Sequence, residues 1–140
     1  MEPLRLAHLW ALATWGGVVL AELIVEIAAR DDAGHAQASR LHFWIDVLIE
    51  VPLLITIVAT GSMLLGRTGG LSQALAVKLG CAFTALTLNA YCVFLVVLRH
   101  NAIADPAEVR RLSRRIRWTG AGIPFGLAAL WIGLTRFHAW

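Results

Sequence analysis

The sequence predicts an all-α integral membrane protein, a bundle of four transmembrane helices that forms a single domain over residues 1–140. Of its 140 residues, 59% are hydrophobic and 15% are charged, whereas soluble proteins average about 45–50% apolar and about 25% charged residues. Four stretches each supply the roughly 20 mostly apolar residues that a spanning helix needs. These runs are too long and unbroken for barrel strands of about 9–11 alternating residues. The composition therefore excludes a water-soluble domain.

The boundaries of the four spans follow from their apolar runs and the breakers between them. The first run has no cleavage-like region, so we expect it to be retained as a helix. The second run ends at Gly66 and the Gly69-Gly70 pair, which suit a short turn. Within it, Pro52 cannot donate to the carbonyl of Leu48 and is expected to kink the helix beside Glu50. The expected spans are 6–29, 41–65, 75–98 and 118–137.

The longest link, residues 99–117, carries the signals of a helix start. Asp105 suits the N-cap, Pro106 the first helical position and Glu108 the third. We expect a brief surface helix here that exposes a basic face. Its arginines are Arg110, Arg111, Arg114 and Arg115.

The distribution of arginine predicts an orientation. The first and third links carry most of the arginines, so the positive-inside rule places them in the cytoplasm and both termini outside, in a bacterial-type inner membrane. The formal charge of +3 does not point to nucleic acid, because the arginines lie beside apolar spans. The partners expected are the lipid bilayer and, if a site is redox-active, a membrane-soluble substrate. A homo-oligomer or a partner subunit is a further alternative.

Polar residues inside three of the spans recur at helical spacing, so each span has one polar face. A charged side chain facing lipid near the bilayer centre costs about 2.5–3.5 kcal/mol, so the three faces are expected to meet at the bundle axis. The first face carries His8, Trp15, Glu22 and Glu26, the second His42, Asp46 and Glu50, and the third Lys78, Asn89, Cys92 and His100.

A metal site is the leading interpretation of this pattern. Counted from the first link at about 1.5 Å per residue, Glu22 is expected level with Glu50, and Glu26 with Asp46. Carboxylates and imidazoles that project inward from four helices are the ligands of di-iron and di-manganese proteins, and they suit iron, manganese or zinc. The Glu-x-x-His spacing of the soluble enzymes is absent. The expected ligands of one or two ions are Glu22, Glu26, His42, Asp46, Glu50 and His100.

Other readings of the same residues stay open. The acids can form ion pairs with Arg30, Arg40 or Arg99 at the cytoplasmic end, or they can line a proton or cation pathway. A non-catalytic accessory subunit is a further alternative. The metal-binding reading allows a membrane oxidoreductase, but no catalytic residue is assigned and enzyme activity stays open.

Short motifs in the first and third spans resemble a known family. These motifs are Ala7-His8-Leu9, Thr14-Trp15-Gly16-Gly17, Lys78-Leu79-Gly80 and Tyr91-Cys92. They resemble the small four-helix membrane proteins of the bacterial haem-b protoporphyrinogen oxidase type, and the opening also resembles the copper-resistance D membrane domains. The resemblance implies a haem-ligating histidine at His8 and a functional lysine at Lys78, in a haem-b oxidase or electron-transfer protein. The acidic cluster around Glu22 and Asp46 departs from that pattern.

Overall fold

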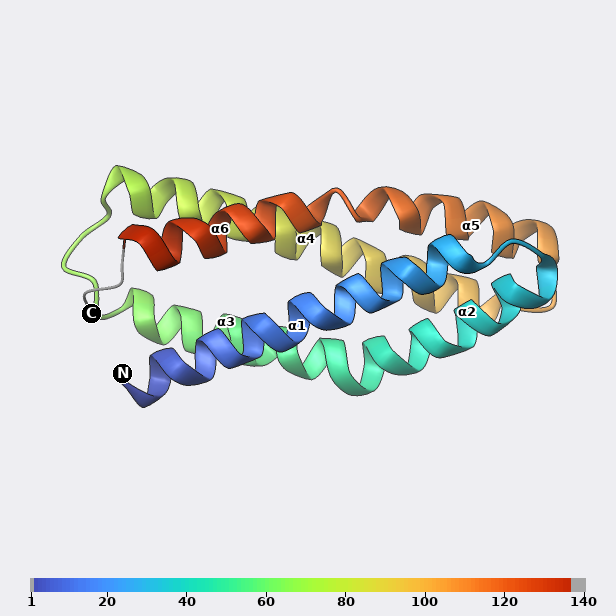
Figure 1. Cartoon of the computed structure of the whole chain (residues 1–140), viewed down its shortest axis with the longest axis horizontal. Helices are drawn as coiled ribbons and strands as arrows, with labels where there is room; N and C mark the ends of the chain where they lie inside the picture. Colours follow the sequence, from blue (N-terminus) through green and yellow to red (C-terminus); the bar gives the residue numbers. More distant parts are fainter. Residues whose placement is uncertain (1, 137–140) are drawn as a thin grey trace.

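The computed structural model describes residues 2–136 and shows four antiparallel helical rods (Figure 1). Within that range, four helical segments are long and apolar enough to cross a membrane, which confirms the predicted fold class. The first rod is α1 (Pro3–Ala28), and the second runs without a break through α2 (Asp32–Ile45), a π-helix η1 (Asp46–Glu50) and α3 (Val51–Leu65). The third rod is α4 (Gln73–Asn101), and the fourth consists of α5 (Pro106–Thr119) and α6 (Gly122–Arg136).

Side-chain caps mark three of the helix starts. The Asp31 carboxylate accepts from the backbone N–H of Gly34 at 2.7 Å, and the Ser72 hydroxyl accepts from Leu75 at 3.3 Å. Asp105 accepts from the N–H groups of the second and third helical residues of α5, at 3.0 and 3.2 Å. Each cap satisfies amide groups that have no partner inside the helix. The predicted N-cap at Asp105 is confirmed.

The second rod begins earlier than the apolar run suggests, and this shifts its register against α1. Helix α2 starts at Asp32, so His35 lies in a helix and is buried. Contacts between the rods show that Glu26 faces His42 and His8 faces Thr60. Glu22 lies with Asp46, one turn from the level of Glu50 at which we expected it. The expected register was wrong because the polar residues before Leu41 extend the helix instead of forming a link.

The fourth rod also differs from expectation. Helix α5 does not lie apart on the surface, because Leu112 and Ile116 pack into a buried cluster with Leu95 and Val96 of α4. Its arginines Arg110, Arg111, Arg114 and Arg115 are exposed. The rod is interrupted at Gly120 and Ala121, within the expected span 118–137, before α6 continues in nearly the same direction (Figure 1). Residue 137 lies outside the described part of the chain.

A π-helix takes the place of the expected simple proline kink. The backbone N–H of Val51 bonds to the carbonyl of Asp46, five residues earlier, and Pro52 follows directly. A single widened turn of this kind is often found at functional sites. It brings Asp46 and Glu50, both buried, to the interior of the bundle.

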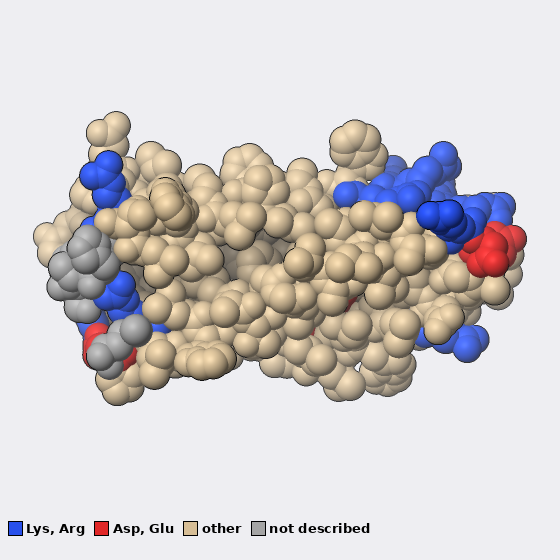
Figure 2. Space-filling view, viewed as in Figure 1, with Lys and Arg blue, Asp and Glu red and all other residues tan. Residues whose placement is uncertain are grey.

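Charged side chains gather at the two ends of the molecule, with a broad uncharged band between them (Figure 2). The end formed by α2 and α5 carries the larger basic group. A band without charges matches the apolar interior of a bilayer, so the surface agrees with an integral membrane protein. The assignment of the arginine-rich end to the cytoplasm stays a prediction from the positive-inside rule.

Candidate metal centre

Three ligand atoms from two rods converge inside the bundle. Oxygen atoms of Glu22 and Asp46 and a ring nitrogen of His42 all lie within 4.8 Å of one another. The His42 Nε2 atom is 3.6 Å from Glu22 Oε2 and 3.5 Å from Asp46 Oδ1. All three side chains are buried, with Asp46 at 0% exposure. The described helices thus form a compact set of one nitrogen and two oxygen donors.

A buried ion pair orients His42 from its other side. Glu26 Oε1 is 2.8 Å from His42 Nδ1 and 2.6 Å from Arg99 Nη2. Arg99 is fully buried and also donates to the hydroxyl of Ser113 at 2.9 Å. When Nδ1–H donates to the Glu26 carboxylate, the lone pair of Nε2 points at Glu22 and Asp46. A carboxylate that fixes the ring of a metal-binding histidine in this way is usual in metalloproteins.

Several oxygen atoms around this set have no hydrogen-bond partner among residues 2–136. They are Glu22 Oε1, Glu26 Oε2, Glu50 Oε2 and both carboxylate oxygens of Asp46. Buried polar atoms are normally satisfied, and the Asp46 carboxyl lies next to those of Glu22 and Glu50. Adjacent carboxylates in a low dielectric repel one another unless protons or a cation neutralise them. The unsatisfied oxygens therefore point to a bound cation or to bound protons.

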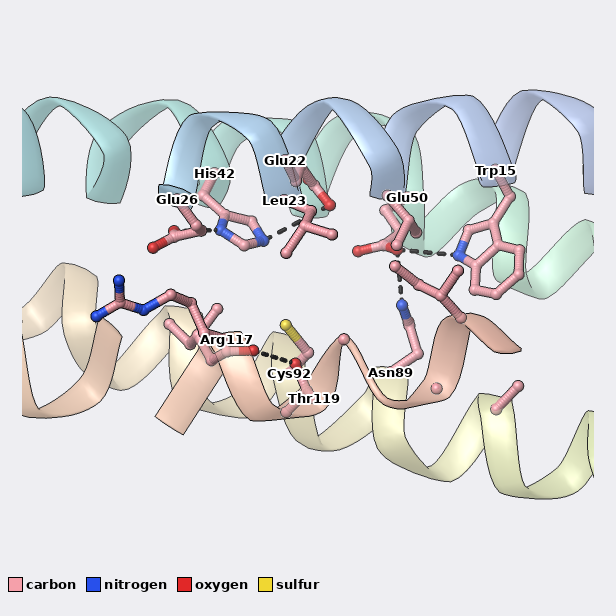
Figure 3. A pocket seen from close by; sticks show the side chains of 16 residues that line it. Trp15, Glu22, Leu23, Glu26, His42, Glu50, Asn89, Cys92, Arg117 and Thr119 are labelled. Atoms are coloured by element: carbon pink, nitrogen blue, oxygen red, sulfur yellow. Dashed lines mark hydrogen bonds and ion pairs between the residues drawn. The ribbon is translucent and has the colours of Figure 1, made fainter. Parts of the chain in front are cut away.

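Glu50 sits one turn further along the axis and is held by two donors. Trp15 Nε1 donates to Glu50 Oε1 at 2.9 Å, and Asn89 Nδ2 donates to the same oxygen at 2.7 Å. A cavity of about 50 Å³ lies between these groups and is also lined by Glu22, His42 and Cys92. Figure 3 shows Glu22, Glu26, His42 and Glu50 along one side, with Asn89 and Cys92 facing them from α4. A cavity of this size holds a few water molecules.

Both irregular helix segments lie at this cavity. The π-helix supplies Glu50, and the interruption between α5 and α6 brings Gly120 and Gly122 to the opposite wall. A Cβ atom at Gly122 would lie 3.3 Å from Leu88 Cβ, so glycine permits the close approach of α6 to α4. Non-helical backbone at membrane depth occurs where it lines a polar cavity or is buried in protein. The chain departs from regular helix where the polar groups meet.

The six expected ligands make different contacts in the structure. Glu22, His42 and Asp46 form the converging set, Glu26 is engaged by Arg99, and Glu50 is held by Trp15 and Asn89. The ring of His100 instead stacks on Phe43, with centroids 3.9 Å apart. Arg99 is a central residue that the sequence placed only among possible ion-pair partners. Arg99 follows Cys92 by seven residues, so helical spacing places it on the polar face of α4 and could have identified it as an interior residue.

The opposite half of the bundle holds the residues singled out by the family resemblance. His8 Nδ1 and Thr60 Oγ1 are 2.8 Å apart. His8 and Lys78 both line a second, larger cavity of about 440 Å³. The structure thus brings these two residues to one cavity, separate from the carboxylate cluster.

Comparison of the chain with protein-family models, with curated proteins and with solved structures finds no match.

Proposed function

We propose that the protein is an integral membrane metalloprotein that binds a divalent iron, manganese or zinc ion through Glu22, His42 and Asp46. The observation that carries this proposal is the convergence of three buried ligand side chains. Glu22 Oε1, His42 Nε2 and both carboxylate oxygens of Asp46 have no hydrogen-bond partner among the described residues. Two carboxylates would balance the charge of one divalent ion. Without a cation, the same carboxylates would have to bind protons to remain in this environment.

The spacing of the donors supports this assignment. Metal bonds of about 2.0–2.1 Å to nitrogen and oxygen place neighbouring donors about 3.4 Å apart in a tetrahedral site and about 3.0 Å apart in an octahedral one. The two distances from His42 Nε2, 3.6 and 3.5 Å, are close to the tetrahedral value. Nitrogen and oxygen donors suit zinc, iron and manganese better than the soft metals that prefer thiolate.

Glu26 and Glu50 have supporting positions in this proposal. Glu26 holds the His42 ring and is itself neutralised by Arg99. Glu50 keeps one oxygen on Trp15 and Asn89 and has its other oxygen unpartnered within residues 2–136. A second ion, if the centre is dinuclear, would take that oxygen together with one from Asp46. His100 contributes to neither arrangement.

Three protein donors leave coordination positions for an exchangeable ligand, as in catalytic metal sites. The small cavity lined by Glu22, His42 and Glu50 supplies space for such a ligand. A redox-active ion at this position would support a membrane oxidoreductase, and zinc would support Lewis-acid chemistry or metal transport. The identity of the bound metal therefore separates these reaction classes.

Metal analysis of the purified protein tests the proposal. We expect about one equivalent of a transition metal in the wild type, and at least a tenfold weaker affinity after Glu22→Gln or Asp46→Asn, because each change removes a charged ligand. Glu108→Gln is the matched control, since Glu108 pairs with Arg111 on the exposed face of α5. Metal content that stays below about a tenth of an equivalent, even after reconstitution, would overturn the proposal. If the wild type binds no metal and Glu22→Gln or Asp46→Asn lowers its stability, the result would instead support an accessory subunit or a proton pathway.

A haem-binding function is the second candidate, and one observation favours it. His8 and Lys78 line the same large cavity, and the His8 contact with Thr60 engages only Nδ1. The Nε2 atom of His8 would then bind the haem iron, which fits the haem-ligating role that the family resemblance implies for His8. A Soret band that disappears in His8→Ala would support this function. Protein that shows no Soret absorption after haem supplementation would exclude it.

A further inference from the structure

The fourth rod marks where the bilayer surface lies at the α2–α5 end of the molecule. Residues 118–135 carry no charge, and at 1.5 Å per residue they extend about 27 Å, close to the roughly 30 Å of a hydrocarbon core. Arg117 is the first charged residue beyond this stretch. Its neighbour Trp118 is 81% exposed, and exposed tryptophan is typical of the interface between membrane and water. Arg117 therefore lies near the level of the lipid head groups.

The exposed side of α5 carries more positive charge than the carboxylates around it neutralise. Arg110 pairs with Asp32, and Arg111 pairs with Glu108. Within residues 2–136, no carboxylate forms an ion pair with the three remaining exposed arginines of this helix, Arg114, Arg115 and Arg117. Arginines at a membrane surface attract anionic lipid, so this side of α5 favours a negatively charged head group.

Two of these arginines lie at the seam between α1 and the fourth rod. Arg117 lines the small polar cavity together with Leu23 of α1, and Arg114 precedes it by three residues, so the two are neighbours on the helix surface. A Cβ atom at Gly120 would lie 3.7 Å from Leu23 Cδ1, so the interruption of the fourth rod lies against α1 here. Ile27, one turn from Leu23, is 60% exposed. The seam thus combines two guanidinium groups with an apolar surface.

We propose that this seam binds one anionic phospholipid of the surrounding leaflet, with its phosphate between Arg114 and Arg117. Its glycerol lies beside Ile27, and one acyl chain follows Leu23 and Val19, which succeed Ile27 at steps of four residues along α1. Guanidinium groups make charge-assisted, bidentate contacts with phosphate. The acyl chain adds little preference, because the other lipids are equally apolar. The proposal does not depend on a bound metal.

Native mass spectrometry of the full chain in detergent tests this proposal. The probes are dioleoylphosphatidylglycerol and dioleoylphosphatidylcholine, which have the same chains and a phosphate, although choline neutralises the charge of the second. We expect one tightly bound phosphatidylglycerol, with an affinity about tenfold or more above that of phosphatidylcholine. The double variant Arg114→Gln/Arg117→Gln is expected to lose this preference. A wild type without any preference would overturn the proposal.

A matched double variant separates a site from general attraction between charges. Arg110→Gln/Arg111→Gln removes the same net charge, but from arginines that have carboxylate partners. Seven residues, about 10 Å of helix, separate Arg110 from Arg117, so we expect the lipid preference to be unchanged. An equal loss in both double variants would contradict a defined site. If the first double variant does not fold, Arg114→Gln alone decides, because an unchanged preference there rules out the phosphate contact.

Two further outcomes identify a different occupant. Glycerol phosphate has the phosphate but no acyl chain, and we expect it not to displace phosphatidylglycerol at equal concentration. Displacement by glycerol phosphate would identify a soluble phosphate ester as the ligand and overturn the lipid assignment. An acidic protein that is lost from Arg114→Gln/Arg117→Gln while phosphatidylglycerol binding is unchanged would assign these arginines to a protein partner, with the same consequence.

Discussion

The buried pair between Arg99 and Glu26 gives the sharpest prediction about stability. Arg99 is 0% exposed and Glu26 is 2% exposed, with 2.6 Å between Nη2 and Oε1. Arg99→Met keeps most of the apolar stem but removes the charge, so Glu26 loses its counter-ion beside Glu22. Breaking a buried pair on one side costs about 3–5 kcal/mol, and we expect a loss of this size. The assay is equilibrium unfolding in detergent micelles.

A double-mutant cycle tests the reason for that loss. Glu26→Gln can still accept from His42 Nδ1 but carries no charge, so adding it to Arg99→Met should restore a large part of the stability. We expect a coupling energy of about 2 kcal/mol or more between the two positions. Arg110→Met is the control, because the Arg110 pair with Asp32 is exposed and such pairs contribute about 0–1 kcal/mol. Additive effects of Arg99→Met and Glu26→Gln, within about 0.5 kcal/mol, would refute the reasoning.

Three further predictions concern the polar centre and its walls. Metal affinity should fall as the pH is lowered, because carboxylate and imidazole ligands must lose their protons to bind; chelator competition across a pH series measures this, and a flat profile would argue against these ligands. Pro52→Ala restores a backbone N–H donor next to the π-helix, so we expect a more regular helix in which the spacing of Asp46 and Glu50 is changed. Metal binding should become at least tenfold weaker. Unchanged metal binding would contradict a role of the π-helix in positioning the ligands. Gly126→Ala places a methyl group against Trp15 and should weaken the hydrogen bond from the Trp15 indole to Glu50. In a protein whose sole tryptophan is Trp15, we expect this as a shift of the tryptophan emission. Gly80→Ala, where a Cβ atom has open space, should cause no shift.

The fold was predictable because a bilayer imposes strong rules on composition and length. Apolar runs identified all four rods, and the Asp105 cap was recognisable from its neighbours. The helix start at Asp32 was not predicted, because the added turns are polar and resemble a link. The start of α5 at Pro106 was predicted, but α5 was expected on the surface and not as part of the fourth rod. Those turns form helix since their neighbours in the bundle bury one side of them, as the packing of Leu112 and Ile116 shows.

The candidate site was predictable as a set of residues but not as an arrangement. Helical spacing identified the polar faces that carry Glu22, Asp46 and Asn89, and these residues do meet in the interior. Which of these residues meet depends on how the first two rods are aligned, and a shift of one turn changes the partners. The length of α2 sets that alignment, and its start was not predicted. The ion pair of Arg99 with Glu26 and the hydrogen bond from Trp15 to Glu50 depend on packing between segments that are distant in the sequence. Residue spacing along one helix does not predict such contacts.

The burial of Arg99 has a consequence for the order in which the bundle is assembled. Chains are made from the amino terminus, so α1, α2 and η1, with Glu22, Glu26 and Asp46, are synthesised before α4 brings the compensating guanidinium. An unpaired carboxylate inside the hydrocarbon region is costly. The first two rods must therefore enter the bilayer with these acids protonated, or wait at the insertion machinery until the third rod arrives. In the second case, stable insertion of the amino-terminal half depends on the synthesis of α4.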